Sequence, residues 1–273
     1  MVLNKDYSFP LISVLMAVYN EKDEYLELAI KSVLNQKYKN LEFIIVNDAS
    51  CQTTKSLLEK WVRFDDRIKL YNLEDNIGLT KALNFGLNKS GGKYIARHDS
   101  DDYSNNNRLD LQIAYLEKNE LIDAVGSFAT IIDSKGLIKG QFIYELNKEK
   151  LLKANHLVHG SMMFRRKVFN ILGGYDNRLF FSQDYGLYLN MIFKYNMNIH
   201  ILPDFLYNLR QHSDSISNKK KFIQLYYSTL AKYTLKKNNQ IKKFEVIISC
   251  LHDFIFIHYL FLGGFIKSIL NRK

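Results

Sequence analysis

Four short apolar runs near the start of the chain are each followed by a polar stretch and then by residues at helical spacing. The runs lie at residues 11–18, 41–46, 68–73 and 94–97. A continuous apolar run of strand length is typical of a strand buried on both faces of a sheet. Strands that alternate with helices predict a parallel sheet joined by right-handed crossovers. We therefore expect an α/β fold.

For two of the expected helices the sequence predicts the buried side or the C-terminal end. The helix over about residues 53–64 turns four apolar side chains to one side, namely Leu57, Leu58, Trp61 and Val62. The following helix is expected to end at Ser90-Gly91-Gly92, because glycine is common at a helix C-cap.

The second half of the sequence is less regular. Residues 121–132 indicate a strand that turns through Ser134-Lys135-Gly136 into a hairpin partner at residues 137–144. Residues 157–164 indicate another strand, followed by a short helix that Gly173-Gly174 would close. A further helix is expected to begin near Ser182.

The polar stretches that follow the strands are candidates for one binding site. Ligands of such sheets bind beyond the carboxyl ends of the strands, so residues 19–21, 47–48 and 99–102 should converge. Asp99 and Asp101 stand two apart and can face one cation. The alternative is a polar turn that caps a helix over residues 108–118. The missing Gly-x-Gly-x-x-Gly and Gly-Lys-Ser/Thr loops disfavour dehydrogenases and P-loop enzymes.

The positive charge of the chain is concentrated in its last sixty or so residues. The net charge is +10, and residues 215–273 carry eleven Lys or Arg against Glu245 and Asp253. Residues 222–236 indicate an amphipathic helix, and the charge-free run 254–266 is too short to span a membrane. Attachment to an anionic membrane surface is the favoured interpretation, with packing on the domain or on a partner as the alternative.

Other partners and compartments are less consistent with the sequence. No base-reading module accompanies the basic residues, so we expect no nucleic-acid partner. The two cysteines lie far apart and form no disulfide or metal pattern, which favours a reducing cytosol. The N-terminus lacks an apolar stretch of the kind found in signal peptides.

Several separated motifs occur in a fixed order, at residues 14–21, 45–50, 76–84, 99–102, 173–176, 183–185, 207–212 and 215–217. In this order they resemble the family 2 glycosyltransferases, inverting enzymes of the GT-A fold that use nucleotide-diphosphate sugars. The resemblance covers about residues 10–217. It implies a GT-A domain over residues 1–217, with a Rossmann-like, mostly parallel sheet flanked by helices. Residues 218–273 would form a basic, amphipathic helical extension that associates with membranes.

The resemblance also implies roles for individual residues. The nucleotide sugar would be bound by Ala17, Tyr19, Glu21, Asp48, Asn76, Lys81, Arg97, Asp99 and Ser100. Asp48 would accept hydrogen bonds from the base, although a carboxylate there could instead cap the helix that follows Ser50. Lys81 would meet the diphosphate or would simply be an exposed helix lysine.

The metal and the catalytic base follow from the chemistry of the family. Mg²⁺ or Mn²⁺ bound through oxygens can stabilise a departing diphosphate, and Asp101 is the expected ligand. His212 would complete the shell, and its nitrogen would favour Mn²⁺, unless it is a structural histidine. Inversion requires a base opposite the leaving group, and by resemblance this base is Asp184.

The sequence departs from the family at two of these motifs. Gln183-Asp184 stands where Glu-Asp is commoner, and Asn47-Asp48-Ala49-Ser50 stands where Asp-Asp-Gly-Ser is frequent. We expect His159, Arg165 and Arg166 to face the acceptor, since paired arginines suit a lipid-linked diphosphate.

The expected function is transfer of a hexose or N-acetylhexosamine from a UDP-sugar to a lipid-linked glycan. By analogy with the family, the pathway would make a bacterial surface polysaccharide such as O-antigen or capsule, and the enzyme would be peripheral on the cytoplasmic face of the membrane. One alternative is a sugar-nucleotide nucleotidyltransferase, which would release pyrophosphate. The other is a non-catalytic nucleotide-sugar-binding or scaffold protein.

Overall fold

The structure is a computed structural model that describes residues 9–211 and 221–237. Within these ranges the chain forms two compact units. The first unit contains residues 9–145, 157–174 and 198–211, and the second contains residues 146–156, 175–197 and 221–237. The predicted domain boundary between residues 217 and 218 lies outside the described residues.

A mixed sheet forms the centre of the first unit. In the described part of the chain its strand order is β3-β2-β1-β4-β8-β6-β9-β5, with β7 paired to β6. The strands are β1 (Ile12–Val18), β2 (Leu41–Asn47), β3 (Ile68–Asn72), β4 (Tyr94–Arg97), β5 (Tyr103–Ser104), β6 (Ala124–Ile132), β7 (Ile138–Phe142), β8 (Met163–Arg165) and β9 (Ile199–Arg210).

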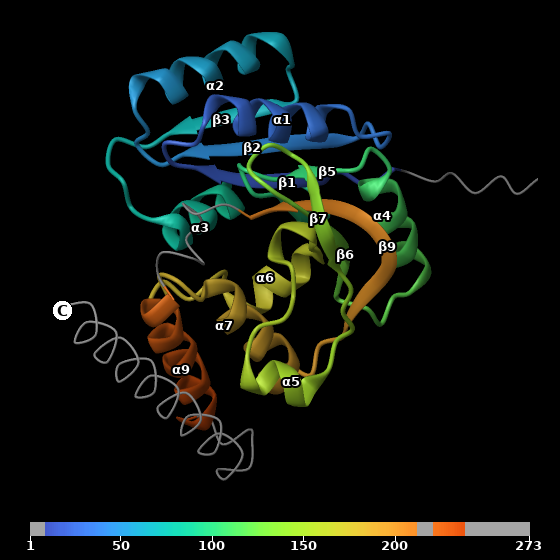
Figure 1. The fold of residues 1–273 in the computed structure, drawn as a ribbon. Helices are drawn as coiled ribbons and strands as arrows, with labels where there is room; N and C mark the ends of the chain where they lie inside the picture. Colours follow the sequence, from blue (N-terminus) through green and yellow to red (C-terminus); the bar gives the residue numbers. More distant parts are fainter. Residues whose placement is uncertain (1–8, 212–220, 238–273) are drawn as a thin grey trace, which may run out of the picture. The chain divides into compact units, whose positions relative to one another are not determined.

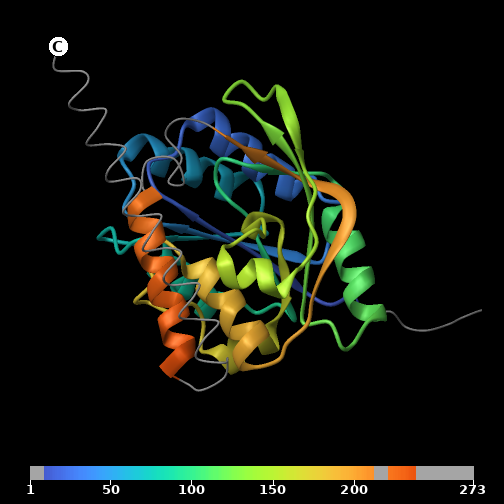
Figure 2. The same ribbon diagram turned by 60° about the horizontal axis from the view of Figure 1, so that its bottom comes forward.

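The four N-terminal strands are parallel, as the sequence predicts. β1 pairs in parallel with both β2 and β4, and β2 pairs in parallel with β3. The sheet then becomes mixed, because β8 runs antiparallel to both β4 and β6. β9 runs parallel to β6 and antiparallel to β5. Figure 2 shows β9, in orange, as a long, curved strand.

The helices of the first unit cover both faces of the parallel strands. They are α1 (Asp23–Leu34), α2 (Gln52–Phe64), α3 (Leu79–Lys89), α4 (Arg108–Lys118) and α6 (Arg166–Leu172). Figure 1 shows α1 and α2 on one side of β1–β3 and α3 on the other. Every residue of β1 is buried, and a Cβ on Gly86 of α3 would clash with Leu15 of β1. This double coverage explains the unbroken apolar run in the sequence.

One helix expectation needs correction, and a second is right about where the helix ends but wrong about the reason. On α2 only Thr54, Leu58 and Trp61 are buried, and Val62 is exposed. The reason is that α2 covers the short strand β3 near the end of the strand order, so only a narrow stripe of the helix is buried. At the end of α3 the C-cap is Ser90, in an extended conformation rather than a left-handed one. Glycine is needed at position 92 for a different reason, since a Cβ there would lie 2.5 Å from the Ser13 nitrogen.

The strand expected over residues 157–164 is largely wrong. A 3₁₀ turn, η1 (His159–Ser161), occupies its centre, and only β8 follows. The Ser161 hydroxyl donates to the Val158 carbonyl at 2.8 Å, which stabilises the turn in competition with a strand.

Two glycine turns are confirmed. Gly136 has a φ of +81° between β6 and β7, and Gly173 has a φ of +76° at the C-cap of α6. Both positions require the left-handed backbone that glycine adopts without strain.

The second unit is helical in its described part. It contains α5 (Lys148–Lys153), α7 (Gln183–Leu189), the π-helix η2 (Asn190–Lys194) and α9 (Lys221–Lys237). Ser182 is the N-cap of α7, as predicted. On α9, Lys232 is buried and donates to the Lys153 carbonyl at 2.7 Å, while Tyr226 and Tyr233 are exposed. Within the described ranges, no helix combines the length and the apolarity needed to cross a bilayer.

Candidate functional site

The polar loops after β1, β2 and β4 meet at one edge of the sheet, as the sequence predicts. β1 and β2 end together, with Val18 opposite Asn47. The Asn20 amide donates to the Ser50 hydroxyl at 3.0 Å, which joins the first two loops. The Ser100 hydroxyl donates to a Glu21 carboxylate oxygen at 3.1 Å, which joins the first loop to the aspartates.

Asp48 organises the loop before α3. Its side chain is buried, and its two oxygens accept the backbone N–H groups of Ile77 at 2.8 Å and Gly78 at 2.9 Å. The Asn76 side chain donates to the Asp48 carbonyl at 3.1 Å. Asp48 is therefore not the cap of α2, whose N-cap is Cys51. Each carboxylate oxygen can accept more than one hydrogen bond, so base recognition by Asp48 stays a prediction.

The other residues expected to bind the nucleotide differ in exposure. Tyr19 is 55% exposed, so its ring is open to stacking, and Lys81 is also exposed. Ala17 is buried near the end of β1, beside the loop that begins at Tyr19.

Residues 99–102, which we call the aspartate turn, give their carboxylates different partners. Arg97 pairs with Asp99, with 2.5 Å between Nη2 and Oδ1. Asp102 is buried, and it accepts the Arg210 amide of β9 at 2.7 Å. Arg210 also donates through Nε to the Asp101 carbonyl at 2.8 Å. Asp101, which lies in the sequence between Asp99 and Asp102, is half-buried.

The surroundings of the turn concentrate negative charge. Burial raises the pKa of Asp102, and the nearby charges of Asp101 and Asp99 raise this pKa further. Burial, followed by the charge of Arg108, lowers the pKa of His98 to about 3, so this ring is neutral at physiological pH. Such a cluster of carboxylates favours a cation in the turn.

Three residues at the turn were given no role by the sequence, namely Arg108, Gly160 and Tyr207. Arg108 is fully buried and donates to the Arg97 carbonyl at 2.8 Å and to the Ser104 hydroxyl at 2.9 Å. A Cβ on Gly160 would clash with the Tyr207 hydroxyl and lie 2.7 Å from Asp99 Oδ2. Gly160 and Tyr207 lie within stretches that the sequence singled out, but no local sequence pattern predicts their contacts with distant residues.

The donor set at the turn fits a metal that shares its shell with phosphate oxygens. In residues 9–211 and 221–237 no group of three or more His, Cys, Asp and Glu side chains could hold an ion alone. Magnesium typically takes one or two carboxylates together with water and phosphate oxygens, so a smaller set is sufficient. His212 lies outside the described residues; Arg210, two positions before it in the sequence, is bound to the aspartate turn.

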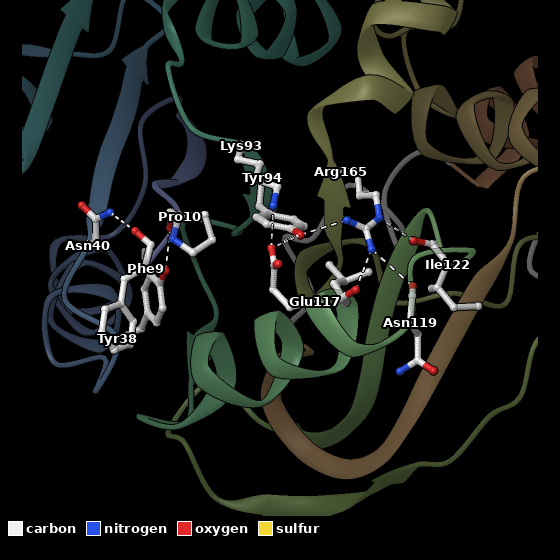
Figure 3. Close-up of polar contacts among 11 residues, drawn as sticks. Phe9, Pro10, Tyr38, Asn40, Lys93, Tyr94, Glu117, Asn119, Ile122 and Arg165 are labelled. Carbon is white, nitrogen blue, oxygen red and sulfur yellow. Dashed lines mark hydrogen bonds and ion pairs between the residues drawn. The ribbon is translucent and has the colours of Figure 1, made fainter. Parts of the chain in front are cut away.

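The three residues assigned to the acceptor are not brought together. His159 belongs to η1 and adjoins Gly160 near the turn, and burial followed by the charge of Arg97 lowers its pKa. Arg165 pairs with Tyr94 at the opposite end of β4. It donates to Ile122 O at 2.7 Å and to Tyr94 Oη at 2.9 Å, as Figure 3 shows.

Arg166 is held at that same end of β4. Its Nε donates to the Gly92 carbonyl at 2.5 Å. The contacts of Arg165 and Arg166 give both residues a structural role, and their contact with an acceptor stays a prediction.

Asp184 belongs to the second unit, in the first turn of α7. Its Oδ2 accepts a hydrogen bond from the Asn155 side chain at 2.7 Å, and its Oδ1 accepts the Tyr185 amide at 2.7 Å. These contacts fix the orientation of the carboxylate within its own unit. The neighbouring Gln183 is buried.

Comparison with known proteins identifies a family. Residues 13–173 match the family model described as Glycosyl transferase family 2. An uncharacterised glycosyltransferase of Methanocaldococcus jannaschii is 34% identical, over 91% of this chain and 89% of its own length. The O-antigen biosynthesis glycosyltransferase WbnJ of Escherichia coli is also 34% identical, over 89% of this chain and 95% of its own.

Solved structures share the fold at low sequence identity. S. aureus TarS 1–349 in complex with UDP-GlcNAc has a TM-score of 0.66 at 19% identity, over 92% of this chain and 73% of that chain. The mannosyltransferase PcManGT from Pyrobaculum calidifontis, in complex with GDP-Man and Mn²⁺, has a TM-score of 0.65 at 17% identity, over 91% of this chain and 70% of that chain. The predicted GT-A fold is thereby confirmed.

Proposed function

Because the chain belongs to the family 2 glycosyltransferases, we propose that it transfers a hexose or N-acetylhexosamine from a UDP-sugar, with inversion, to a lipid-linked glycan. The observation that carries this proposal is the aspartate turn at the carboxyl edge of the sheet, hydrogen-bonded to the loop after β1. Nucleotide sugars bind at such an edge, and a charged diphosphate needs a cation beside it.

The loops at the sheet edge supply the donor site in this proposal. Tyr19 would stack on the base, and Asp48 would accept a hydrogen bond from it while holding the loop before α3. Arg97 and Asp99, paired with each other, would face the ribose and the diphosphate. Asp101 and His212 would hold Mn²⁺ or Mg²⁺, which as a Lewis acid stabilises the charge that develops on the diphosphate leaving group.

Asp184 would be the base that deprotonates the acceptor hydroxyl. A base must keep one oxygen directed at the proton that it removes. The hydrogen bonds from Asn155 and from the Tyr185 amide give the Asp184 carboxylate a fixed orientation. Gln183 beside it carries no charge, so Asp184 is the carboxylate of this pair.

A surface-polysaccharide pathway is supported by the relatives, which include WbnJ and a putative teichuronic acid biosynthesis glycosyltransferase of Bacillus subtilis. We extend the proposal to a peripheral position on the cytoplasmic face of the membrane, where lipid-linked acceptors are found. The support is the basic composition of residues 215–273, which would attract anionic lipids.

A panel of nucleotide sugars with Mn²⁺, assayed with and without lipid-diphosphate acceptors, tests the proposal. Acceptor-dependent release of nucleoside diphosphate is the expected result. Pyrophosphate release from a nucleoside triphosphate and a sugar phosphate would instead identify a nucleotidyltransferase. Binding of UDP-sugar without turnover on any acceptor would favour the non-catalytic alternative.

A further inference from the structure

The hydroxyl of Tyr207, on β9, lies between the two ends of the aspartate turn. It accepts the backbone N–H of Asp99 at 3.1 Å. It also makes a side-chain hydrogen bond to the Asp102 carboxyl group, and because this bond lowers the pKa of Asp102, the phenol is the donor. One hydroxyl thus bonds to both the first and the last residue of the turn.

The position of this hydroxyl is set by packing around the ring. Tyr207 is fully buried, and the Arg108 guanidinium lies over the ring at 5.2 Å from its centre. The His98 ring meets it edge-on at 5.5 Å. Gly160 lies against the hydroxyl, where a Cβ would clash with it. Because the ring is held on several sides, the hydroxyl is a fixed point to which the turn is attached.

A second contact from the same strand fixes the middle of the turn. Arg210 donates through Nε to the Asp101 carbonyl and through its amide to Asp102. Because the Asp99 N–H, the Asp101 carbonyl and the Asp102 carboxyl group are all held by β9, the position from which the Asp101 side chain leaves the backbone is fixed. Residues outside a metal's own ligands commonly set ligand direction, and their loss typically lowers metal affinity about 10–100-fold.

We propose that Tyr207 is a positioning residue, whose hydroxyl holds the aspartate turn in the shape that directs Asp101 toward a divalent cation. The proposal rests on the proposed function, since Asp101 is a metal ligand only there. β9 would thus contribute a positioning residue to the site, in addition to the metal ligand expected just after the strand at His212.

Substitution Tyr207→Phe removes only the hydroxyl and tests the proposal. Mn²⁺ binding in the presence of UDP is measured by titration of the free-ion electron paramagnetic resonance signal. We expect the dissociation constant for Mn²⁺ to rise about tenfold. At saturating Mn²⁺ we expect kcat to return to within about threefold of the unsubstituted protein, since the reacting groups are intact.

The matched control is Tyr38→Phe. Tyr38 is also a buried tyrosine, and its hydroxyl donates to the Pro10 carbonyl at 2.5 Å, as Figure 3 shows. This variant should leave Mn²⁺ affinity unchanged. Gly160→Ala is a second variant that displaces the Tyr207 hydroxyl without removing it, and it should weaken Mn²⁺ binding in the same direction.

The outcomes separate this inference from the function on which it rests. If the unsubstituted protein binds Mn²⁺ with UDP and both Tyr207→Phe and Gly160→Ala bind it within twofold as tightly, the positioning role is wrong and the proposed function stands. If the unsubstituted protein itself binds no Mn²⁺ with UDP, the metal site fails and the positioning role fails with it.

Discussion

The hydroxyl of Ser100 donates to the carboxylate of Glu21 across 3.1 Å, although the two residues are 79 positions apart in the sequence. Their hydrogen bond joins the loop expected to bind the nucleotide to the turn expected to bind the metal. Binding of the nucleotide should therefore change the affinity for the metal. Binding of the metal should change the affinity for the nucleotide by the same factor, because coupling between two sites is reciprocal.

Ser100→Ala should reduce this coupling. A hydrogen bond to a charged group contributes about 1.5–3 kcal/mol when shielded and less when exposed, so we expect UDP affinity in the presence of Mn²⁺ to fall about three- to tenfold. UDP affinity without metal should change by less than twofold. Isothermal titration of UDP with and without Mn²⁺ measures both values. Ser56→Ala, which removes the acceptor of an exposed hydrogen bond from Gln52 on α2, is the control. Equal losses with and without metal would contradict the prediction.

Asp184→Asn and Asp101→Ala should impair different steps. Asp184→Asn keeps the shape of the side chain but cannot take a proton, so we expect kcat to fall at least about a hundredfold with UDP-sugar binding retained. Asp101→Ala should instead weaken metal-dependent donor binding and raise KM. Steady-state kinetics together with equilibrium binding of the donor distinguish the two. Unchanged turnover of Asp184→Asn would exclude it as the base.

Ala49→Gly should stabilise the protein. Ala49 has a φ of +57°, in the left-handed region that costs a residue with a Cβ about 1–2 kcal/mol. Glycine removes this cost and loses about 0.4–1 kcal/mol through the greater freedom of the unfolded chain. We expect a net gain of about 0.5 kcal/mol in the free energy of unfolding, measured with urea. Ala114→Gly, on the exposed side of α4, should lose about 1 kcal/mol, so the two variants should differ in sign.

His98→Gln should flatten the pH dependence of stability between pH 7 and 5.5. Burial lowers the pKa of His98 from 6.5 to about 3, so between these values the unfolded chain binds a proton that the folded chain does not. Stability therefore falls as the pH falls, by about 1 kcal/mol over this window for one such histidine. Urea midpoints at several pH values should decline less in His98→Gln than in the unsubstituted protein. Parallel declines would show that His98 is not the titrating group.

The first half of the fold was predictable because its signals are local. The buried strand β1 and the helix α1, whose six buried residues recur at helical spacing, follow from the pattern of the sequence itself. Gly136 and Gly173 mark turns for an equally local reason, since their backbones need positive φ.

The parts that could not be predicted depend on contacts between distant residues. Asp48 was recognisable as a functional candidate, but its hydrogen bonds go to residues 29 and 30 positions away. The turn η1 forms in place of an expected strand because the Ser161 hydroxyl donates to the Val158 carbonyl. The pattern of apolar residues does not predict this hydrogen bond. The buried donors of Arg108 reach segments that only the folded sheet brings together.

The attachment of the aspartate turn to β9 has a consequence for how the protein is made. The partners of Asp99 and Asp102 on β9 lie 108 positions later in the sequence. During synthesis from the N-terminus, the loops after β1 and β2 can form well before these partners have left the ribosome. A nascent chain would thus acquire its first two loops early and the final form of its aspartate turn only when β9 pairs, so the proposed metal site would be complete only after the sheet of the first unit.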